Sequence, residues 1–210
     1  MSKIDEIALA VENGNAKVME GLVTEALNEG ADAVTILNNG MMKAMETVGL
    51  KFQQGNLFVP EMLRAARAMK TGMEILQPKL AGKTNISLGK CIIGTVHGDL
   101  HDIGKNLVAL MIESSGFEVI DLGVDVAVDK FIAAIRENAD VKLVALSCLL
   151  TTTMPAMQET VGAIKASGLS GFKVMVGGAP ITQEFADTVG ADGYSTDAAS
   201  AAQLAKKLAA

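Results

Sequence analysis

The sequence predicts an α/β protein in two parts, an N-terminal helical bundle followed by a parallel sheet with flanking helices. Two patterns carry this prediction. Apolar residues recur at helical spacing up to about residue 80, and beyond it short apolar runs alternate with helical patterns. At 210 residues, 50% of them hydrophobic, the chain is long enough for two small domains with packed cores.

The first part is expected to form four or five helices, and its glycines and prolines suggest where they begin and end. Gly30 and Gly55 are typical helix stops, since glycine readily adopts the left-handed conformation found there. Pro60 fits the first turn of a new helix, and Pro78 is expected to close that helix. These signals indicate a small helical bundle.

Residues 81–90, AGKTNISLGK, break the helical pattern with polar residues and glycine. We therefore expect a linker there, with a helical bundle over residues 1–84 and an α/β domain over residues 85–210. The α/β domain should take its strands from the runs CIIGTV, FEVIDLG, LVALSCL and FKVMVGG, with a weaker fifth strand near residues 191–195. Ligands of parallel sheets bind beyond the carboxyl ends of the strands, so the site should lie there.

Composition excludes several classes of function. The net charge is −6 and no stretch concentrates Lys or Arg, which argues against a nucleic-acid partner. No apolar run approaches the ~20 residues of a membrane span, and the N-terminus lacks the pattern of a signal peptide, so we expect no membrane association and a cytoplasmic location. Cys91 and Cys148 lie inside apolar runs, which favours reduced core residues over a disulfide or a zinc site.

An aspartate and a histidine follow the first predicted strand, in the segment GTVHGDLHDIGKN. An imidazole such as that of His101 can ligate a metal through one nitrogen while a carboxylate such as that of Asp99 holds the proton on the other. Taken alone, the pair is more typical of a helix cap beside a surface histidine. His97, on the last turn of the strand, is expected to be structural.

Three elements in order make the pair more specific. Asp99–Gly104 (DLHDIG), Ser147–Leu149 (SCL) and Gly177–Gly178 fall at the ends of the first, third and fourth predicted strands. Together and in their spacing they resemble the signature of the cobalamin-binding domain, which has a Rossmann-like (flavodoxin-like) parallel sheet. In the bundle, Phe58–Arg67 (FVPEMLRAAR) resembles the cap domain of methionine synthase and related methyl-carrier proteins. The resemblance thus covers nearly the whole chain.

The resemblance implies a cobalamin or other corrinoid cofactor, bound base-off, with its nucleotide base displaced from cobalt and His101 as the lower axial ligand. Asp99 would hold the His101 ring and couple methyl transfer to protonation. Thr153, where methionine synthase has a serine, would complete this hydrogen-bonded relay. No side chain is expected to react itself, because the cofactor carries the chemistry.

Other residues implied to contact the cofactor lie in the same loops or in the cap. Ser147 and Leu149 would flank the nucleotide base, and the two glycines of the third element would let the nucleotide tail pass close to the backbone. Phe58 and Met62 could exclude water from cobalt or simply belong to the bundle core. The further positions in this set are Gly98, Ile103, Gly104, Thr151, Gly177 and Gly178.

By the same resemblance, the chain is expected to carry a methyl group in anaerobic one-carbon metabolism, between a substrate-specific methyltransferase and a second methyltransferase that methylates tetrahydrofolate or a thiol. A reductive activase would be a further partner. Methanol, methylamines and methoxylated aromatics are the candidate donors, and the sequence does not choose among them. The chain would be a component of an enzyme system, because its two domains leave no room for donor and acceptor sites.

Three alternatives remain at this point. A cobalamin-dependent sensor or regulator usually places a Trp and a His of its bundle near the cofactor, and residues 1–84 contain neither. The cobalamin subunit of a mutase would share the three elements without needing the cap. A cofactor-free flavodoxin-like domain would require all three elements to coincide by chance.

Overall fold

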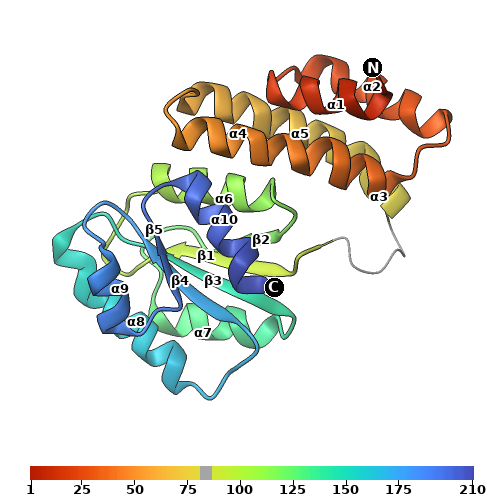
Figure 1. Cartoon of the computed structure of the whole chain (residues 1–210). Coiled ribbons are helices and arrows are strands. Elements are labelled where there is room, and N and C mark those ends of the chain that lie inside the picture. Colours follow the sequence, from red (N-terminus) through yellow and green to blue (C-terminus); the bar gives the residue numbers. More distant parts are fainter. Residues whose placement is uncertain (81–86) are drawn as a thin grey trace. The chain divides into compact units, whose positions relative to one another are not determined.

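The structure, a computed structural model, describes residues 1–80 and 87–210. The chain divides into two compact units, residues 1–86 and 87–210 (Figure 1). The predicted boundary between residues 84 and 85 falls outside the described residues, as does most of the predicted linker.

The first unit consists of helices packed against one another. Ser2 starts the first helix with a reciprocal cap, in which its hydroxyl accepts the Asp5 backbone N–H and the Asp5 carboxylate accepts the Ser2 N–H. The elements are α1 (Lys3–Glu12), α2 (Ala16–Asn28), α3 (Ala33–Thr35), the π-helix η1 (Ile36–Met42), α4 (Lys43–Gln53) and α5 (Val59–Leu80). The predicted bundle is confirmed.

Glycine and proline act mostly as predicted in this unit. Gly30 and Gly55 follow the last turns of α2 and α4 with φ of 89° and 72°, and Pro60 lies in the first turn of α5. The prediction for Pro78 is wrong, since α5 continues to Leu80. A proline in the last turn removes only one backbone hydrogen bond, so helical geometry can persist for two more residues.

The second unit is a parallel α/β domain, as predicted. Its five-stranded sheet has the order β2-β1-β3-β4-β5, and every neighbouring pair is parallel. The strands are β1 (Lys90–Thr95), β2 (Glu118–Asp121), β3 (Val141–Ser147), β4 (Lys173–Gly177) and β5 (Gly193–Ser195). The helical elements are α6 (Ile103–Glu113), α7 (Val128–Glu137), the short 3-10 helix η2 (Thr151–Thr153), α8 (Met154–Ala166), α9 (Gln183–Val189) and α10 (Ala198–Ala209).

Helices cover both faces of this sheet (Figure 1). Alternate residues of each strand belong to two hydrophobic cores, one on each face of the sheet. Ile93 and Leu143 pack on the side of α6 and α10, whereas Ile92 and Val144 pack on the side of α7 and α8. The chain leaves β1 toward β2 and then crosses back to β3, so the strand order reverses between β1 and β3. That reversal is the place where ligands of open α/β sheets bind.

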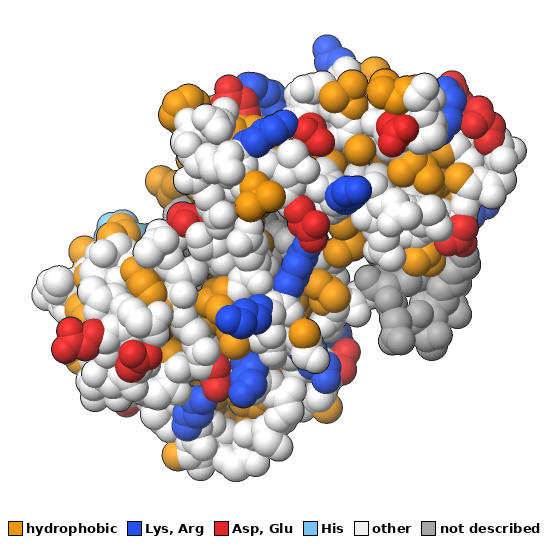
Figure 2. Space-filling model, viewed as in Figure 1, with side chains coloured by type: hydrophobic (Ala, Val, Ile, Leu, Met, Phe, Trp, Pro, Cys, Tyr) orange, Lys and Arg blue, Asp and Glu red, His pale blue; other side chains and the backbone are white. Residues whose placement is uncertain are grey.

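Both cysteines are buried and unpaired, as predicted, and burial raises the pKa of the Cys91 thiol to about 12. On the face drawn in Figure 2, basic and acidic side chains are interspersed over each unit. None of the helices in the described residues is long and apolar enough to cross a membrane.

Candidate functional site

The candidate site is built from the loops that follow β1, β3 and β4, at the carboxyl edge of the sheet. The last residues of four strands are in register across that edge, and all are small: Thr95, Ser147, Gly177 and Ser195. The first three lie two residues after Ile93, Ala145 and Met175, which belong to the core beneath α6 and α10, and Ser195 pairs with Gly177. Because side chains alternate along a strand, the row lies on that side of the sheet. Small side chains leave room beside the strand ends.

Asp99 ties two of these loops together and is fully buried. Its Oδ1 accepts the backbone N–H of His101 at 3.1 Å and lies 2.7 Å from His101 Nδ1. Its Oδ2 accepts the backbone N–H groups of Leu149 at 2.7 Å and Leu150 at 3.3 Å, and the Thr153 hydroxyl at 2.8 Å. One carboxylate therefore fixes the loop after β1 against the loop after β3.

This environment keeps Asp99 ionised. Burial by itself raises the pKa of a carboxyl group, but here hydrogen bonds from Leu149, His101 and Thr153 outweigh it. The pKa of Asp99 consequently lies well below its usual range. A buried anion is thus held within reach of a histidine ring.

Only one ring nitrogen of His101, Nδ1, faces the Asp99 carboxylate, and the other, Nε2, does not. Nδ1 lies against the Asp99 carboxylate and therefore carries a proton, which leaves Nε2 with the lone pair that can ligate a metal. The ring is half-exposed, whereas its backbone carbonyl accepts a 2.8 Å hydrogen bond from the buried Thr95 hydroxyl. The imidazole is therefore anchored at one end and accessible at the other.

Among the described residues, His101 does not belong to a cluster of protein ligands. Across residues 1–80 and 87–210, no group of three or more His, Cys, Asp or Glu side chains could hold a metal ion. If His101 ligates a metal, that metal must arrive with most of its coordination supplied by another molecule. A metal bound in a macrocycle meets this condition.

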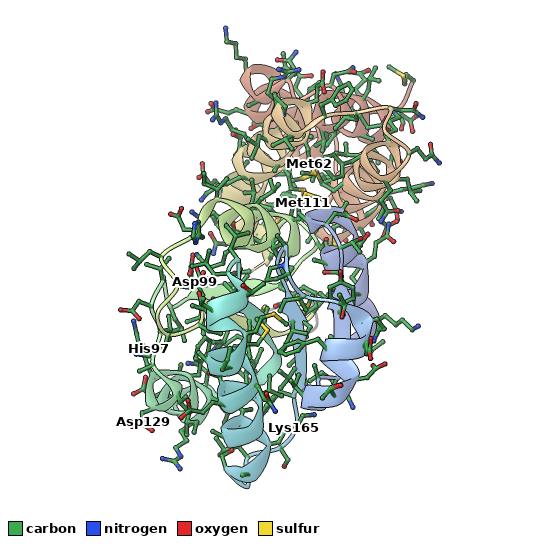
Figure 3. The ribbon with its side chains drawn as sticks, turned by 90° about the vertical axis from the view of Figure 1, so that its left-hand side faces the viewer. Met62, His97, Asp99, Met111, Asp129 and Lys165 are labelled. Atoms are coloured by element: carbon green, nitrogen blue, oxygen red, sulfur yellow. The ribbon has the colours of Figure 1, made fainter. Side chains whose placement is uncertain are left out.

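The turn before Asp99 is held by a third loop. Gly98 adopts φ of 81° in the turn closed by the Asp99 N–H and the Val96 carbonyl at 3.1 Å. Asp125, between β2 and α7, accepts the Gly98 N–H at 2.7 Å and lies 2.7 Å from His97 Nδ1. His97 lies at the outer edge of the unit, with Asp99 deeper (Figure 3). His97 thus pairs with Asp125, whereas His101 pairs with Asp99.

The loop after β3 departs from the sheet earlier than the apolar run LVALSCL predicts, because β3 ends at Ser147. Cys148 makes one more bond to the Gly177 carbonyl at 3.1 Å, and the next two N–H groups turn to Asp99 instead of to a strand. The Cys148 thiol packs with the core beneath α7 and α8, on the opposite side from Ser147, and lies 3.2 Å from the Thr153 hydroxyl.

Large aliphatic side chains are exposed in these same loops. Leu100 and Ile103 flank His101 in sequence and are 72% and 85% exposed, while Leu149 and Leu150 are 42% and 40% exposed. Four exposed aliphatic residues in the loops that hold a half-exposed imidazole form a surface suited to an apolar body.

The glycines of the predicted site differ in what the fold requires of them. A Cβ on Gly178, at φ of 128°, would lie 1.7 Å from the Cys148 carbonyl oxygen, so the protein itself demands glycine there. A Cβ on Gly177 would meet only the Ser195 carbonyl at 3.5 Å, and one on Gly104 would meet nothing within 4 Å. The fold therefore does not explain why these two positions lack a side chain.

The remaining predicted residues have more peripheral positions. Thr151, at the start of η2, is exposed. Phe58 is 67% exposed before α5 and Met62 is buried, and both belong to the helical unit, so they are not among the residues that the α/β unit brings together. Thr95, Asp125 and Leu150 were missed by the sequence analysis. Of these three, only Thr95 could have been noticed in the sequence, because it is the one hydroxyl residue in the apolar run CIIGTV.

Comparison with known proteins gives a consistent picture. Residues 89–203 match the family described as B12 binding domain, and residues 3–77 match a second family with the same description. A corrinoid protein of Desulfitobacterium hafniense is 39% identical over 99% of this chain and 98% of its own length. Trimethylamine corrinoid protein 2 of Methanosarcina acetivorans is 42% identical over 98% of each chain. The methanol:cobalamin methyltransferase complex MtaBC of Methanosarcina barkeri contains a chain with a TM-score of 0.85 and 30% identity, over 99% of this chain and 79% of that one.

Proposed function

The chain belongs to the family of B12-binding corrinoid proteins, and from that premise we propose that it carries a methyl group on the cobalt of a base-off corrinoid with His101 as the lower ligand. The observation that carries the proposal is the Asp99–His101 pair at the strand-order reversal. Asp99 occupies Nδ1, which leaves Nε2 as the only ring nitrogen able to ligate cobalt.

The residues present fit such a cofactor in three ways. A single imidazole is the right complement for a metal whose equatorial ligands come from a macrocycle. The exposed side chains of Leu100, Ile103, Leu149 and Leu150 offer an apolar surface for the ring. The path of the nucleotide tail is supported by the in-register row of small residues and by Gly177 and Gly104, where the fold does not require glycine.

The chain's own residues hold and tune the ligand. When bound, the corrinoid supplies the cobalt that accepts and releases the methyl group. Asp99 keeps the Nδ1 proton in place and so directs Nε2 outward. Thr153, Leu149 and Leu150 keep Asp99 ionised for this role.

The partners we propose are those that a methyl carrier needs. A substrate-specific methyltransferase would deliver the methyl group, a second one would remove it to tetrahydrofolate or a thiol, and a reductive activase would restore oxidised cofactor. One relative is named for trimethylamine, and one similar solved chain belongs to a complex that acts on methanol. Since their donors differ, we propose the shared architecture and not a particular donor.

Paramagnetic resonance of the Co(II) form tests the ligand. The full chain is reconstituted with unlabelled cobalamin, once as ordinary protein and once as ¹⁵N-labelled protein. We expect about one cobalamin per chain and a change in the axial nitrogen splitting from three lines to two on labelling. His101→Ala should abolish that change, and His97→Ala should retain it. Three lines from both wild-type preparations would mean that the nucleotide base is the ligand and that the proposal is wrong.

A further inference from the structure

The loop between β2 and α7 contains a residue in an unusual conformation. Asp125 has φ of 51°, and among the described residues it alone combines a side chain with positive φ. This region is unfavourable for residues with a Cβ, although aspartate tolerates it better than most. Such conformations persist where surrounding contacts impose them and often mark functional sites.

The contacts of Asp125 all reach the loop that carries Asp99. Its carboxylate Oδ1 accepts the Gly98 N–H at 2.7 Å, and its own backbone N–H donates to the Asp99 carbonyl at 2.9 Å. On either side, the Val126 N–H donates to the Thr95 carbonyl and the Thr95 N–H to the Gly123 carbonyl, each at 3.0 Å. The β2–α7 loop is thus bonded along the whole turn that leads to Asp99.

Asp125 makes these bonds at a positive φ. Its side chain and its backbone N–H bond to two adjacent residues, Gly98 and Asp99. The turn has only one hydrogen bond of its own, from the Asp99 N–H to the Val96 carbonyl. Gly98 lacks a side chain to restrain it, and at φ of 81° it would otherwise be free to change conformation.

We propose that Asp125 is a positioning residue, which fixes the turn of residues 96–99 and thereby sets the direction of the Asp99 carboxylate and the His101 ring. The inference rests on the proposed function, since it concerns the ligand assigned there. The neighbouring pair of Asp125 with His97 contributes little, because both side chains are exposed and water screens them. The short bond from Gly98 carries the effect.

Three variants separate the contributions. Asp125→Gly adopts φ of 51° without strain and keeps the backbone donor, but it removes the carboxylate. Asp125→Asn tolerates the same φ and keeps a side-chain oxygen for the Gly98 N–H. His97→Ala removes the surface partner alone. Asp129→Asn is the matched control, because Asp129 is an exposed acidic residue in the first turn of α7 and lies on the same side of the unit as His97 (Figure 3).

Two measurements test the role of Asp125, one on the apoprotein and one on the cobalamin-loaded protein. In the apoprotein, Asp125→Gly should speed hydrogen exchange of the Gly98 and Asp99 amides by about tenfold or more, as expected for the loss of one well-formed hydrogen bond. In the cobalamin-loaded protein, part of the Co(II) resonance should lose the histidine nitrogen. Asp125→Asn, His97→Ala and Asp129→Asn should stay close to wild type in both.

The outcomes distinguish this inference from the function on which it rests. If the wild-type protein shows histidine coordination and Asp125→Gly matches it in both exchange and resonance, the role of Asp125 is overturned and the proposed function stands. If the wild-type protein itself shows no histidine nitrogen, the ligand assignment fails first and the inference fails with it. Both the inference and the proposed function are supported if wild type shows slow amide exchange and full histidine coordination, Asp125→Gly loses them and Asp125→Asn retains them.

Discussion

Asp99 Oδ1 lies 2.7 Å from His101 Nδ1, while the other oxygen of the same carboxylate accepts three hydrogen bonds from the loop after β3. Asp99 therefore does two things at once: it directs the imidazole and it joins two loops of the sheet. A substitution at Asp99 should affect stability as well as the cofactor, and the two effects can be separated.

Asp99→Asn should lower the free energy of unfolding at neutral pH by about 1–3 kcal/mol, because the new NH₂ must face an N–H donor on one side or the other. The single tyrosine, Tyr194 in β5, reports on the α/β unit, so urea unfolding of the apoprotein followed by its fluorescence is the measurement. Asp102→Asn, at an exposed position in the same loop, is the control. Equal stability of wild type and Asp99→Asn would contradict the geometry.

The same pair of proteins should differ in their dependence on pH. The pKa of Asp99 is depressed in the folded state, so its contribution to stability is fully present above the unfolded pKa of about 3.9. It is lost as pH falls from there through the folded pKa. The difference between wild type and Asp99→Asn should therefore shrink steadily below about pH 4. A constant difference down to strong acid would mean that Asp99 is not held as an anion.

Thr153→Val removes the hydroxyl that lies 2.8 Å from Asp99 and keeps nearly the same shape. We expect a loss of about 1 kcal/mol at neutral pH and an acid unfolding midpoint shifted to higher pH, because the less stable variant has less free energy to lose before it unfolds. Acid titration followed by Tyr194 fluorescence checks the shift. Thr153→Ser retains the hydroxyl and should resemble wild type. Should valine and serine behave alike, the hydroxyl plays no part.

The sequence was sufficient for the features that repeat or lie close together in the chain. Apolar runs located every strand, their alternation with helices predicted parallel pairing, and a local motif placed Asp99 and His101 beyond β1. Thr153 came from resemblance, since no local pattern links it to a residue so distant in sequence. The structure supplies the hydrogen bond.

What could not be predicted depends on contacts between loops. Asp125 bonds to Gly98 across 27 positions, through a backbone conformation that leaves no periodicity in the sequence. The early end of β3 follows from the competition of Asp99 for backbone N–H groups. Gly178 was assigned to the cofactor, whereas its contact with the Cys148 carbonyl is a reason internal to the fold.

Cys148→Ala tests whether the buried thiol belongs to the relay. Its sulfur lies 3.2 Å from both the Thr153 hydroxyl and the Leu150 carbonyl, yet Thr153 keeps its bond to Asp99 without it. We expect a packing loss of about 1 kcal/mol and an unchanged cobalt spectrum in the loaded protein. Cys91→Ala, at the other buried cysteine, is the control for packing alone. A spectral shift confined to Cys148→Ala would show that the thiol orients Thr153.

The two adjacent glycines should respond oppositely to an added side chain. Gly178→Ala forces a Cβ into the Cys148 carbonyl and requires φ of 128°. It should therefore lower the free energy of unfolding of the α/β unit by at least ~2 kcal/mol, which shifts the unfolding transition to a lower urea concentration. Gly177→Ala meets only an ordinary contact with the Ser195 carbonyl, and at the last residue of β4 it should leave stability unchanged or slightly raised.

A larger side chain at Gly177 should weaken cobalamin binding although it has little effect on stability. Gly177→Val suits a strand but projects two methyl groups into the row of small residues formed with Thr95, Ser147 and Ser195, where we propose that the nucleotide tail passes. We expect its affinity for cobalamin to fall at least about tenfold, a loss of about 1.4 kcal/mol, while Tyr194 fluorescence shows an unfolding transition near that of wild type. Cobinamide, which lacks the nucleotide tail, separates steric exclusion from general damage. It should bind wild type and Gly177→Val alike, because it does not use the path. If cobalamin binds Gly177→Val as tightly as it binds wild type, the tail does not pass beside β4. If both corrinoids weaken equally, the substitution has disturbed the surface for the ring, and the tail must be sought on another side of the sheet.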